Sequence, residues 1–345
     1  MSEPGATRAV AWVEWMERYQ VPLYLAALAL GTATGLILPD AAGALEPAIN
    51  PILVALLYAT FLGVPLTRLR TAVTDARFVV ALLIVNFVLA PLVVAPLSRL
   101  VSDSPALLMG LLLVLLAPCV DYVMVFTRLA GGAWERILAA SPVLMLTQTL
   151  LLPIWLAALA GPGLASISRR PFALAFIVMI ALPLGLSALT QWASARYRPA
   201  ARVQSGTTAL MVPLMMATLM VVTASQIAAV ASHLGLLVRV IPIFLIFAAI
   251  MPLPGNVVGL LAHQDRSARL ALAFSGTTRN SLVVLPLALA LPDTLAPIVV
   301  VTQTLVELIV MVVYVRLLPR LIRDPPAGSR GLLPPHLHRY DIEHA

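Results

Sequence analysis

The chain has 345 residues, of which 61% are hydrophobic and 11% are charged. Soluble domains carry about 25% charged residues, so this composition excludes a soluble globular protein and indicates an integral membrane protein. The formal net charge of +7 does not indicate a nucleic-acid partner, because the arginines that produce it stand between apolar runs, where membrane topology places them.

The two ends of the chain differ from its apolar middle. Residues 1–20 are polar and end in an aromatic-rich stretch, which indicates a short interfacial segment on the cytoplasmic side and no cleavable signal peptide. Residues 324–345 are rich in proline and are expected to form a disordered cytoplasmic tail. The single cysteine excludes an intramolecular disulfide.

Apolar runs of about 20 residues predict about ten membrane-spanning helices between these ends. The first five occupy residues 21–38, 47–66, 78–97, 106–127 and 137–159. The second five occupy residues 172–192, 207–230, 236–261, 270–291 and 295–317. A Gly-Pro-Gly sequence at 161–163 separates the two sets, so we expect two five-helix repeats over residues 21–165 and 166–323.

The arginines indicate how these helices are oriented. With both termini in the cytoplasm, 17 of the 22 basic residues fall in inside segments, and only Arg99, Arg169, Arg170 and Arg239 fall outside. Positive charge is retained on the cytoplasmic side, so the sequence predicts a multi-pass protein of the cell (inner) membrane with both termini inside. An odd number of spans in each half then inserts the second repeat inverted relative to the first.

Two spans carry polar interruptions at matching places in the two halves. In the fourth span, a proline, a cysteine and an aspartate follow a leucine-rich run, and in the ninth, residues 274–281 read Phe-Ser-Gly-Thr-Thr-Arg-Asn-Ser. Discontinuous helices at corresponding positions of inverted halves are typical of a transporter's binding site. The sequence therefore predicts an all-α polytopic membrane protein with discontinuous fourth and ninth helices.

Cys119 and Asp121 are the candidate functional residues of the first interruption. A lone cysteine in an apolar span is usually a small hydrophobic residue, but a thiolate is also a soft ligand that suits a trivalent metalloid. A carboxylate at this depth needs a partner or a cavity. Two interpretations of Asp121 stay open: a structural ion pair with Arg279, and a proton carrier.

The second interruption contributes Arg279, and the last span contributes a third buried charge, Glu307. An arginine at this depth needs an anion, which Asp121, Glu307 or a substrate carboxylate can supply. Two acids and one base leave a net negative centre, which favours a bound cation or a proton held on one acid. We expect Asp121 and Arg279 to meet near the midplane with Glu307 in the same layer. The candidate substrate-binding residues are Cys119, Arg279, Asn280 and Ser281, and the candidate proton-coupling residues are Asp121 and Glu307.

These residues resemble a known family. Residues 116–127, 279–281 and 305–307 are similar to the arsenical-resistance (arsenite efflux permease) branch of the bile acid:sodium symporter superfamily. The resemblance covers residues 21–317 and implies a core domain of spans three to five and eight to ten beside a panel of the other four. It also implies that Cys119 and Glu307 are both needed for arsenite export coupled to proton entry. Sodium-coupled relatives carry cation ligands where this chain has Ser275 and Arg279, so we expect no sodium coupling.

Together these features predict a secondary active transporter that exports arsenite or antimonite by proton antiport. The alternative is uptake of a small organic anion, with Arg279 binding its carboxylate. The buried charges disfavour a receptor or scaffold, and no catalytic constellation indicates an enzyme. No cofactor, resident metal or nucleic-acid partner is expected, whereas a small solute and the lipid bilayer are, and the oligomeric state stays open.

Overall fold

The computed structural model describes residues 12–13, 15–16, 18–38, 40, 43–63, 75–120, 122–160, 174, 177–291 and 295–323. Within these residues all regular elements are helices, which confirms the all-α prediction. Six of the described helices are long and apolar enough to cross a membrane: Glu46–Gly63, Ala76–Val101, Trp134–Ala160, Met211–Ala228, Gly235–Leu261 and Leu295–Leu321. Two shorter apolar helices are Pro22–Ile37 and Pro105–Leu115. The total of ten spans stays a prediction.

The first half of the chain contains two uninterrupted helices, a helix with a π turn, a split helix and a long helix. In chain order they are α2 (Gln20–Ile37), α4 (Glu46–Gly63), α6 (Ala76–Ile84), the π turn η2 (Val85–Leu89), α7 (Ala90–Ser98), the 3₁₀ turn η3 (Arg99–Val101), α8 (Pro105–Leu115), α9 (Tyr122–Leu129) and α10 (Trp134–Ala160). The predicted interruption of the fourth span is the gap between α8 and α9.

The second half follows a similar order. Its elements are the π turn η5 (Ile177–Ala181), α12 (Leu182–Ser194), the polar helix α13 (Arg198–Ala209), α14 (Met211–Ser232), α15 (Leu234–Ile250), α16 (Pro252–Leu261), α17 (Arg266–Thr277), α18 (Ser281–Leu289) and α19 (Leu295–Leu321). The gap between α17 and α18 is narrower than the polar stretch 274–281, because residues 274–277 are still helical.

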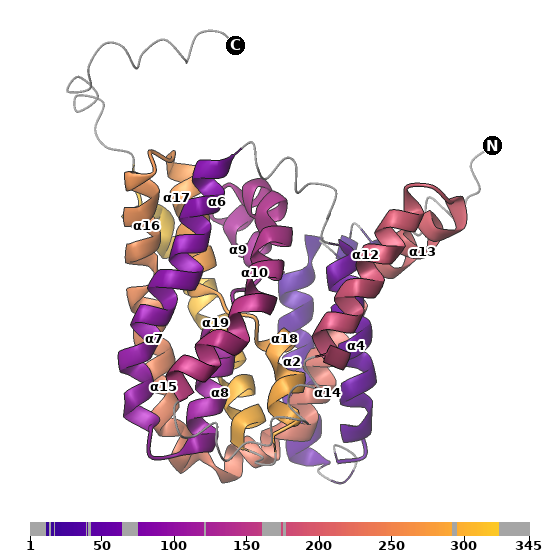
Figure 1. The fold of residues 1–345 in the computed structure, drawn as a ribbon. Coiled ribbons are helices and arrows are strands. Elements are labelled where there is room, and N and C mark those ends of the chain that lie inside the picture. The colour runs from indigo at the N-terminus through magenta and orange to yellow at the C-terminus, as the bar shows by residue number, and fades with distance from the viewer. Residues whose placement is uncertain are drawn as a thin grey trace, which may run out of the picture.

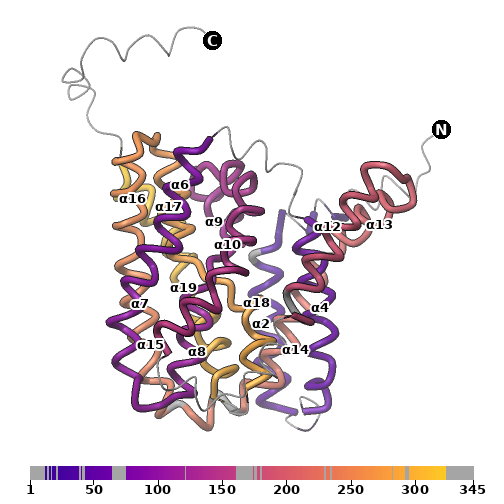
Figure 2. The backbone as a smooth tube through the Cα atoms, viewed as in Figure 1, coloured from indigo at the N-terminus to yellow at the C-terminus, as the bar shows by residue number. Residues whose placement is uncertain are grey.

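The helices form two groups that stand side by side (Figures 1 and 2). The core group contains α6 to α10 and α15 to α19, and the panel group contains α2, α4, α12, α13 and α14. The groups touch where α14 meets α19 and where α4 meets α18. Both groups combine helices from the two halves of the chain, as the resemblance implies for a core and a panel.

Close helix packing makes the panel group compact. Gly31 of α2 faces α14 so closely that an added methyl group would lie 2.5 Å from the carbonyl oxygen of Met220. A side chain at this position would therefore push the two helices apart, and only glycine allows the observed approach. We infer that α2 and α14 behave as one unit.

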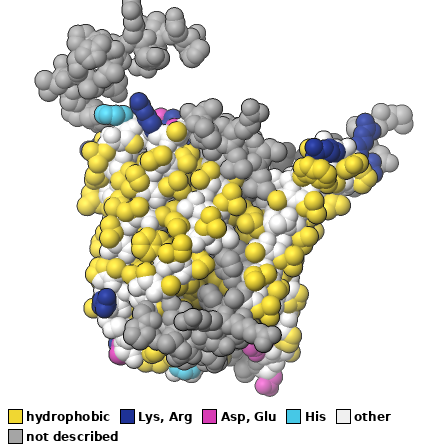
Figure 3. Space-filling view, in the orientation of Figure 1, with side chains coloured by type: hydrophobic (Ala, Val, Ile, Leu, Met, Phe, Trp, Pro, Cys, Tyr) yellow, Lys and Arg dark blue, Asp and Glu magenta, His cyan; other side chains and the backbone are white. Residues whose placement is uncertain are grey.

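Hydrophobic side chains cover most of the face in Figure 3, and charged side chains gather toward its two ends. Large exposed hydrophobic side chains of the described residues include Leu92, Leu150 and Ile309, with 63%, 70% and 70% of their surface exposed. Exposed apolar side chains in such numbers are unfavourable in water and favourable in lipid. The surface thus agrees with a multi-pass membrane protein.

Some sequence-based expectations fall outside the described residues. They are the tail at 324–345, the Gly-Pro-Gly sequence at 161–163, and residues 1–11 of the N-terminal segment. The described residues of that segment between 12 and 18 are helical, and the rings of Trp12 and Trp15 stack with their centroids 5.3 Å apart. The proposed boundaries of the two repeats stay a prediction.

Candidate functional site

The two helix interruptions cross each other as short antiparallel segments. Pro118 and Arg279 form an antiparallel bridge. The N–H of Asn280 donates to the carbonyl of Ala117 at 2.7 Å, and the N–H of Cys119 donates to the carbonyl of Thr278 at 3.3 Å. Unpaired backbone groups are very unfavourable at membrane depth, so each break stabilises the other by hydrogen bonding. We refer to residues 116–120 and 278–280 as the crossing.

Local sequence explains where the helices stop. Pro118 has no N–H, so α8 cannot continue through it with normal hydrogen bonding. In the other segment of the crossing, the side chain of Asn280 accepts a hydrogen bond from the N–H of Val283 at 3.2 Å and thereby caps the start of α18. Each break therefore contains the C-terminus of one helix and the N-terminus of the next: α8 and α9 at the first, α17 and α18 at the second.

The Arg279 side chain is fully buried in the core group. Its guanidinium donates to the carbonyls of Leu115 (3.4 Å), Ser275 (3.5 Å) and Gly276. Its central carbon lies 5.0 Å from the ring centroid of Phe247. These contacts stabilise the cation through carbonyl dipoles and an aromatic face, while Nε has no hydrogen-bond partner among the described residues.

Asn86 links the guanidinium to a neighbouring helix. Its side-chain oxygen accepts from Arg279 at 3.3 Å, and its amide nitrogen donates to the hydroxyl of Ser275 and the carbonyl of Leu82, both at 3.0 Å. Asn86 lies in the π turn η2, and such turns often occur at functional sites. The amide thus fixes both Arg279 and the end of α17.

Glu307 lies on the other side of the crossing backbone. Oε2 accepts a hydrogen bond from the backbone N–H of Arg279 at 2.9 Å and another from the side chain of Gln303. Oε1 is 2.6 Å from the hydroxyl of Tyr122. The three ion pairs among the described residues do not include Glu307 with Arg279. The guanidinium–Glu307 pair that the sequence allowed is therefore absent, because Glu307 meets the backbone of Arg279 and the guanidinium points elsewhere.

Cys119 lies within the crossing and is fully buried. It belongs to an apolar cluster that includes Phe126 and Leu308. Its backbone N–H binds Thr278, the residue before the one whose N–H binds Glu307. Two of the predicted site residues, Cys119 and Glu307, are thus attached to consecutive residues of the second break.

Asn280 and Ser281, which follow Arg279 in the second break, each have a buried polar atom without a hydrogen-bond partner among the described residues. These atoms are the amide nitrogen of Asn280 and the hydroxyl oxygen of Ser281. Ser281 also lines a small pocket between the two groups, together with Thr223 of α14 and Thr304 of α19. Buried polar atoms without partners are rare and need an explanation, such as a bound solute or water.

The predicted meeting of Asp121 with Arg279 lies outside the described residues. Tyr122 and Phe247 also contact the predicted site residues, and neither was predicted from the sequence. The position of Tyr122, directly after the proline, cysteine and aspartate of the break, was an available signal for the tyrosine. Nothing in the local sequence singled out Phe247, since aromatic residues are common in apolar helices.

A cavity of about 840 Å³ lies between the two groups, along α9 and at the starts of α2, α10 and α14. Arg18 and Arg128 provide positive charge, and Trp15, Trp134, Tyr24 and Tyr122 provide aromatic surface. The guanidinium of Arg128 lies over the ring of Trp134 at 5.4 Å. This lining suits a solute that has both an apolar body and a negative charge.

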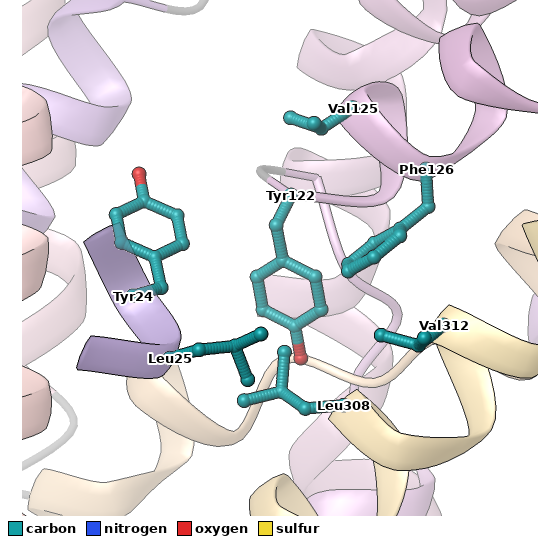
Figure 4. A pocket seen from close by; sticks show the side chains of 7 residues that line it. All are labelled: Tyr24, Leu25, Tyr122, Val125, Phe126, Leu308 and Val312. Atoms are coloured by element: carbon teal, nitrogen blue, oxygen red, sulfur yellow. The ribbon is translucent and has the colours of Figure 1, made fainter. Parts of the chain in front are cut away.

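Figure 4 shows a small pocket next to this cavity. Tyr122 extends from α9 with its ring between Leu25 and Phe126, and its hydroxyl lies beside Leu308. The Tyr122 and Phe126 rings meet edge to face at 6.2 Å. Tyr24, Tyr122 and Val125 line both the large cavity and this pocket, so the two adjoin at these side chains.

One end of the core group is tied by a polar network around Arg136. Its guanidinium donates to Gln264 at 2.8 Å and to Asp265 at 3.2 Å, and it lies 3.5 Å from Asp75. Asp265 caps α17 through the N–H of Ala268. Partial burial opposes ionisation of Asp265, but the N–H of Ala268, the hydroxyl of Ser267 and the nearby arginines outweigh it and lower its pKa. The starts of α6, α10 and α17 are therefore joined at this end.

Comparison with known proteins identifies the family. Residues 50–233 match the sodium bile acid symporter family, a region that includes most of α4, the helices from α6 to α14, and residues 116–120 of the crossing. No curated protein matches the chain. The match covers more than half of the sequence, and the helical membrane fold agrees with a transporter. The chain belongs to the sodium bile acid symporter family.

Proposed function

We propose that the chain is a ten-span secondary active transporter of the cell (inner) membrane with both termini in the cytoplasm. The arginines support this orientation, since Arg136 and Arg266 lie at one end of the core group, together with the end of α19. The ion pair of Arg239 with Asp103 lies at the other end, near the starts of α15 and α8. The first end is the cytoplasmic one by the positive-inside rule, and the large cavity opens there.

The two halves, residues 21–165 and 166–323, are inverted repeats. The antiparallel pairing of their breaks supports this proposal, because two equivalent segments of inverted halves run in opposite directions. The crossing is then the common centre of the two repeats, and the solute and the coupling ion bind around it.

The solute is arsenite or antimonite, which moves outward. The observation that carries this proposal is that Cys119 and Glu307 bind consecutive residues of the second break. The thiol of Cys119 displaces one hydroxyl of the neutral trihydroxide as water and forms a single sulfur–metalloid bond, which water reverses on release. Asn280 and Ser281 supply hydrogen bonds to the remaining hydroxyls, and Arg279 orders the break that presents them.

The coupling ion is the proton, which Glu307 and Asp121 exchange. The guanidinium of Arg279 already lies among carbonyl oxygens of residues 115, 275 and 276 and the side-chain oxygen of Asn86. Oxygens in such an arrangement are the ligands that a sodium ion would use, and a permanent cation there removes the need for one. We therefore infer that transport does not depend on sodium, although the family is named for it.

A second candidate is the uptake of an organic anion. The cavity favours it, because a volume of about 840 Å³ with two arginines and four aromatic side chains exceeds what arsenite needs. Such a solute would bind between the two groups, and Cys119 would have no chemical role.

Purified protein in proteoliposomes separates these possibilities. We expect arsenite transport to follow an imposed pH gradient, to ignore a sodium gradient at constant pH, and to vanish in Cys119→Ser. Sodium dependence at constant pH would overturn the proposed coupling. Uptake of a bile acid that is equal in the wild type and in Cys119→Ser, with no arsenite transport in either, would favour the organic anion.

A further inference from the structure

Tyr122 joins the cavity to the proposed proton carrier. Its ring lines the cavity, while its hydroxyl lies 2.6 Å from Oε1 of Glu307 and 2.9 Å from the carbonyl oxygen of Arg279. The side chain is 7% exposed, so the hydroxyl is buried although the ring reaches the cavity wall. The hydroxyl therefore contacts Glu307 and the crossing rather than the cavity.

The number of hydrogens at this hydroxyl limits its hydrogen bonds. A phenol has one hydrogen, and the carbonyl of Arg279 can only accept. When Tyr122 donates to that carbonyl, the short contact to Glu307 is a hydrogen bond only if Glu307 is protonated and donates to the phenol oxygen. When Glu307 is ionised, Tyr122 must donate to it, and the carbonyl of Arg279 loses its donor. Both distances lie in the normal range for O–H···O bonds.

We propose that Tyr122 signals the charge of Glu307 to the crossing by turning its single hydroxyl hydrogen between Glu307 and the carbonyl of Arg279. The two positions of the phenol hydrogen correspond to the two states of the acid. The proposal rests on the proton coupling proposed above and adds a residue to it. Tyr122 is a positioning residue, because it acts on the transported solute only through Glu307 and the crossing.

The backbone provides the path from Glu307 to the solute site. The carbonyl of Arg279 is adjacent to the N–H of Asn280, which holds Ala117 across the crossing at 2.7 Å. The N–H of Arg279 itself binds Oε2 of Glu307. A change in the charge of Glu307 therefore alters the hydrogen bonds of both the N–H and the carbonyl of Arg279. These groups lie beside residues 116–120, the segment of the crossing that contains Cys119.

Few other titratable groups of the described residues surround Glu307. The elements packed against α19 contribute Tyr122 and Arg128 from α9, Arg239 from α15, and Cys119 and Arg279 from the crossing, and α2 contributes Tyr24 across the pocket. The sequences of α8, α14 and α18 contain no titratable side chain. Tyr122 is the member of this set that hydrogen-bonds to Glu307 through its side chain.

Infrared difference spectroscopy of the full-length protein in lipid tests the proposal. A pH change should produce a carboxylic acid C=O band that is absent in Glu307→Gln. We expect this band to move to higher frequency in Tyr122→Phe, because the acid loses the acceptor of its proton. An unchanged band in Tyr122→Phe would overturn the proposal.

Tyr314→Phe is the matched control. Tyr314 lies on the same helix as Glu307 and also donates to a main-chain carbonyl, that of Ala248 at 2.9 Å. Loss of its hydroxyl should leave the frequency of the Glu307 band as in the wild type. An equal shift of this band in Tyr314→Phe would mean that loss of any tyrosine hydroxyl disturbs the acid, which contradicts a specific role of Tyr122.

A second measurement needs no substitution of Tyr122. In the wild type, titration of Glu307 should be accompanied by a change in a tyrosine band, and Glu307→Gln should lose both signals together. A carboxyl band that titrates without any tyrosine change would overturn the proposal. These spectra require no solute, so they remain decisive if arsenite is not transported, whereas sodium-driven transport would overturn the proposed coupling and leave the spectra unaffected.

Discussion

The two charges at the crossing lie in contrasting environments. Arg279 points into the core group, where carbonyls, Asn86 and Phe247 surround it and no solvent reaches it. Glu307 lies on the other side of the same backbone, next to Tyr122, whose ring lines the large cavity. One charge is enclosed by groups that cannot titrate, and the other has a titratable neighbour at a cavity wall.

This difference separates a structural role from a functional one. A permanent cation surrounded by carbonyl dipoles maintains the shape of the broken helices and has no reason to change state. A carboxylate that binds a phenol, an amide and one backbone N–H can exchange a proton without disturbing the fold. We therefore expect substitutions on the Arg279 side to affect folding and substitutions on the Glu307 side to affect transport.

The largest effect is expected for Arg279→Ala. The substitution leaves several buried carbonyls without a donor, and each costs about 1–3 kcal/mol. The variant should give little monodisperse protein in size-exclusion chromatography after detergent extraction. Arg239→Ala is the matched control, since Arg239 is exposed and pairs with Asp103, and it should express like the wild type. Normal yield and thermal stability of Arg279→Ala would show that the enclosed cation is not structural.

Glu307→Gln should have the next largest effect, on transport alone. The amide has the same shape and can still accept from the N–H of Arg279, so the fold should be retained. It cannot release a proton, and we expect the pH-driven arsenite flux to fall by about 10²-fold or more. Flux is measured in proteoliposomes at equal protein content. Wild-type flux in this variant would mean that the proton is carried elsewhere, with Asp121 the first candidate.

Cys119→Ser should disturb the structure less than the two substitutions above and still abolish metalloid transport. The side chains differ little in volume, so we expect normal insertion and a similar melting temperature, but the hydroxyl is a poor soft ligand. Arsenite tolerance of an exporter-deficient cell that expresses the variant provides the measurement. Full tolerance would remove the thiol from the mechanism and leave the cavity as the solute site.

The smallest effect is expected far from the crossing, at Asp103. The hydrogen bond from Arg239 is the main cause of the lowered pKa of this carboxyl. A lowered pKa in the folded state contributes stability above the unfolded pKa, and this contribution disappears as pH falls through the folded value. Asp103→Asn should thus lower the melting temperature slightly at neutral pH and not at all in acid. A difference that persisted in acid would contradict this assignment.

The sequence predicted the helix breaks more accurately than the contacts around them. It predicted the breaks at Pro118 and Arg279 and the buried Glu307, and the structure brings the two breaks together and attaches Glu307 to one of them. It did not predict that Arg279 would bind carbonyls rather than Glu307. The direction of a long side chain depends on the packing of α6, α15 and α17 around it, which local sequence does not contain.

Residue type and order alone predict a membrane protein, helices over the long apolar runs, and two interrupted helices. Lipid provides no hydrogen bonds to the backbone, so long apolar runs must be helical, and a proline or a polar group inside one must have a partner. The tertiary structure decided which groups became partners. Tyr122 and Glu307 are 185 residues apart, and Asn86 and Arg279 are 193 apart. Only the packing of the two halves brings such residues within hydrogen-bond distance, and the contrast between a cation held by carbonyls and a buried acid held by a phenol follows from that packing.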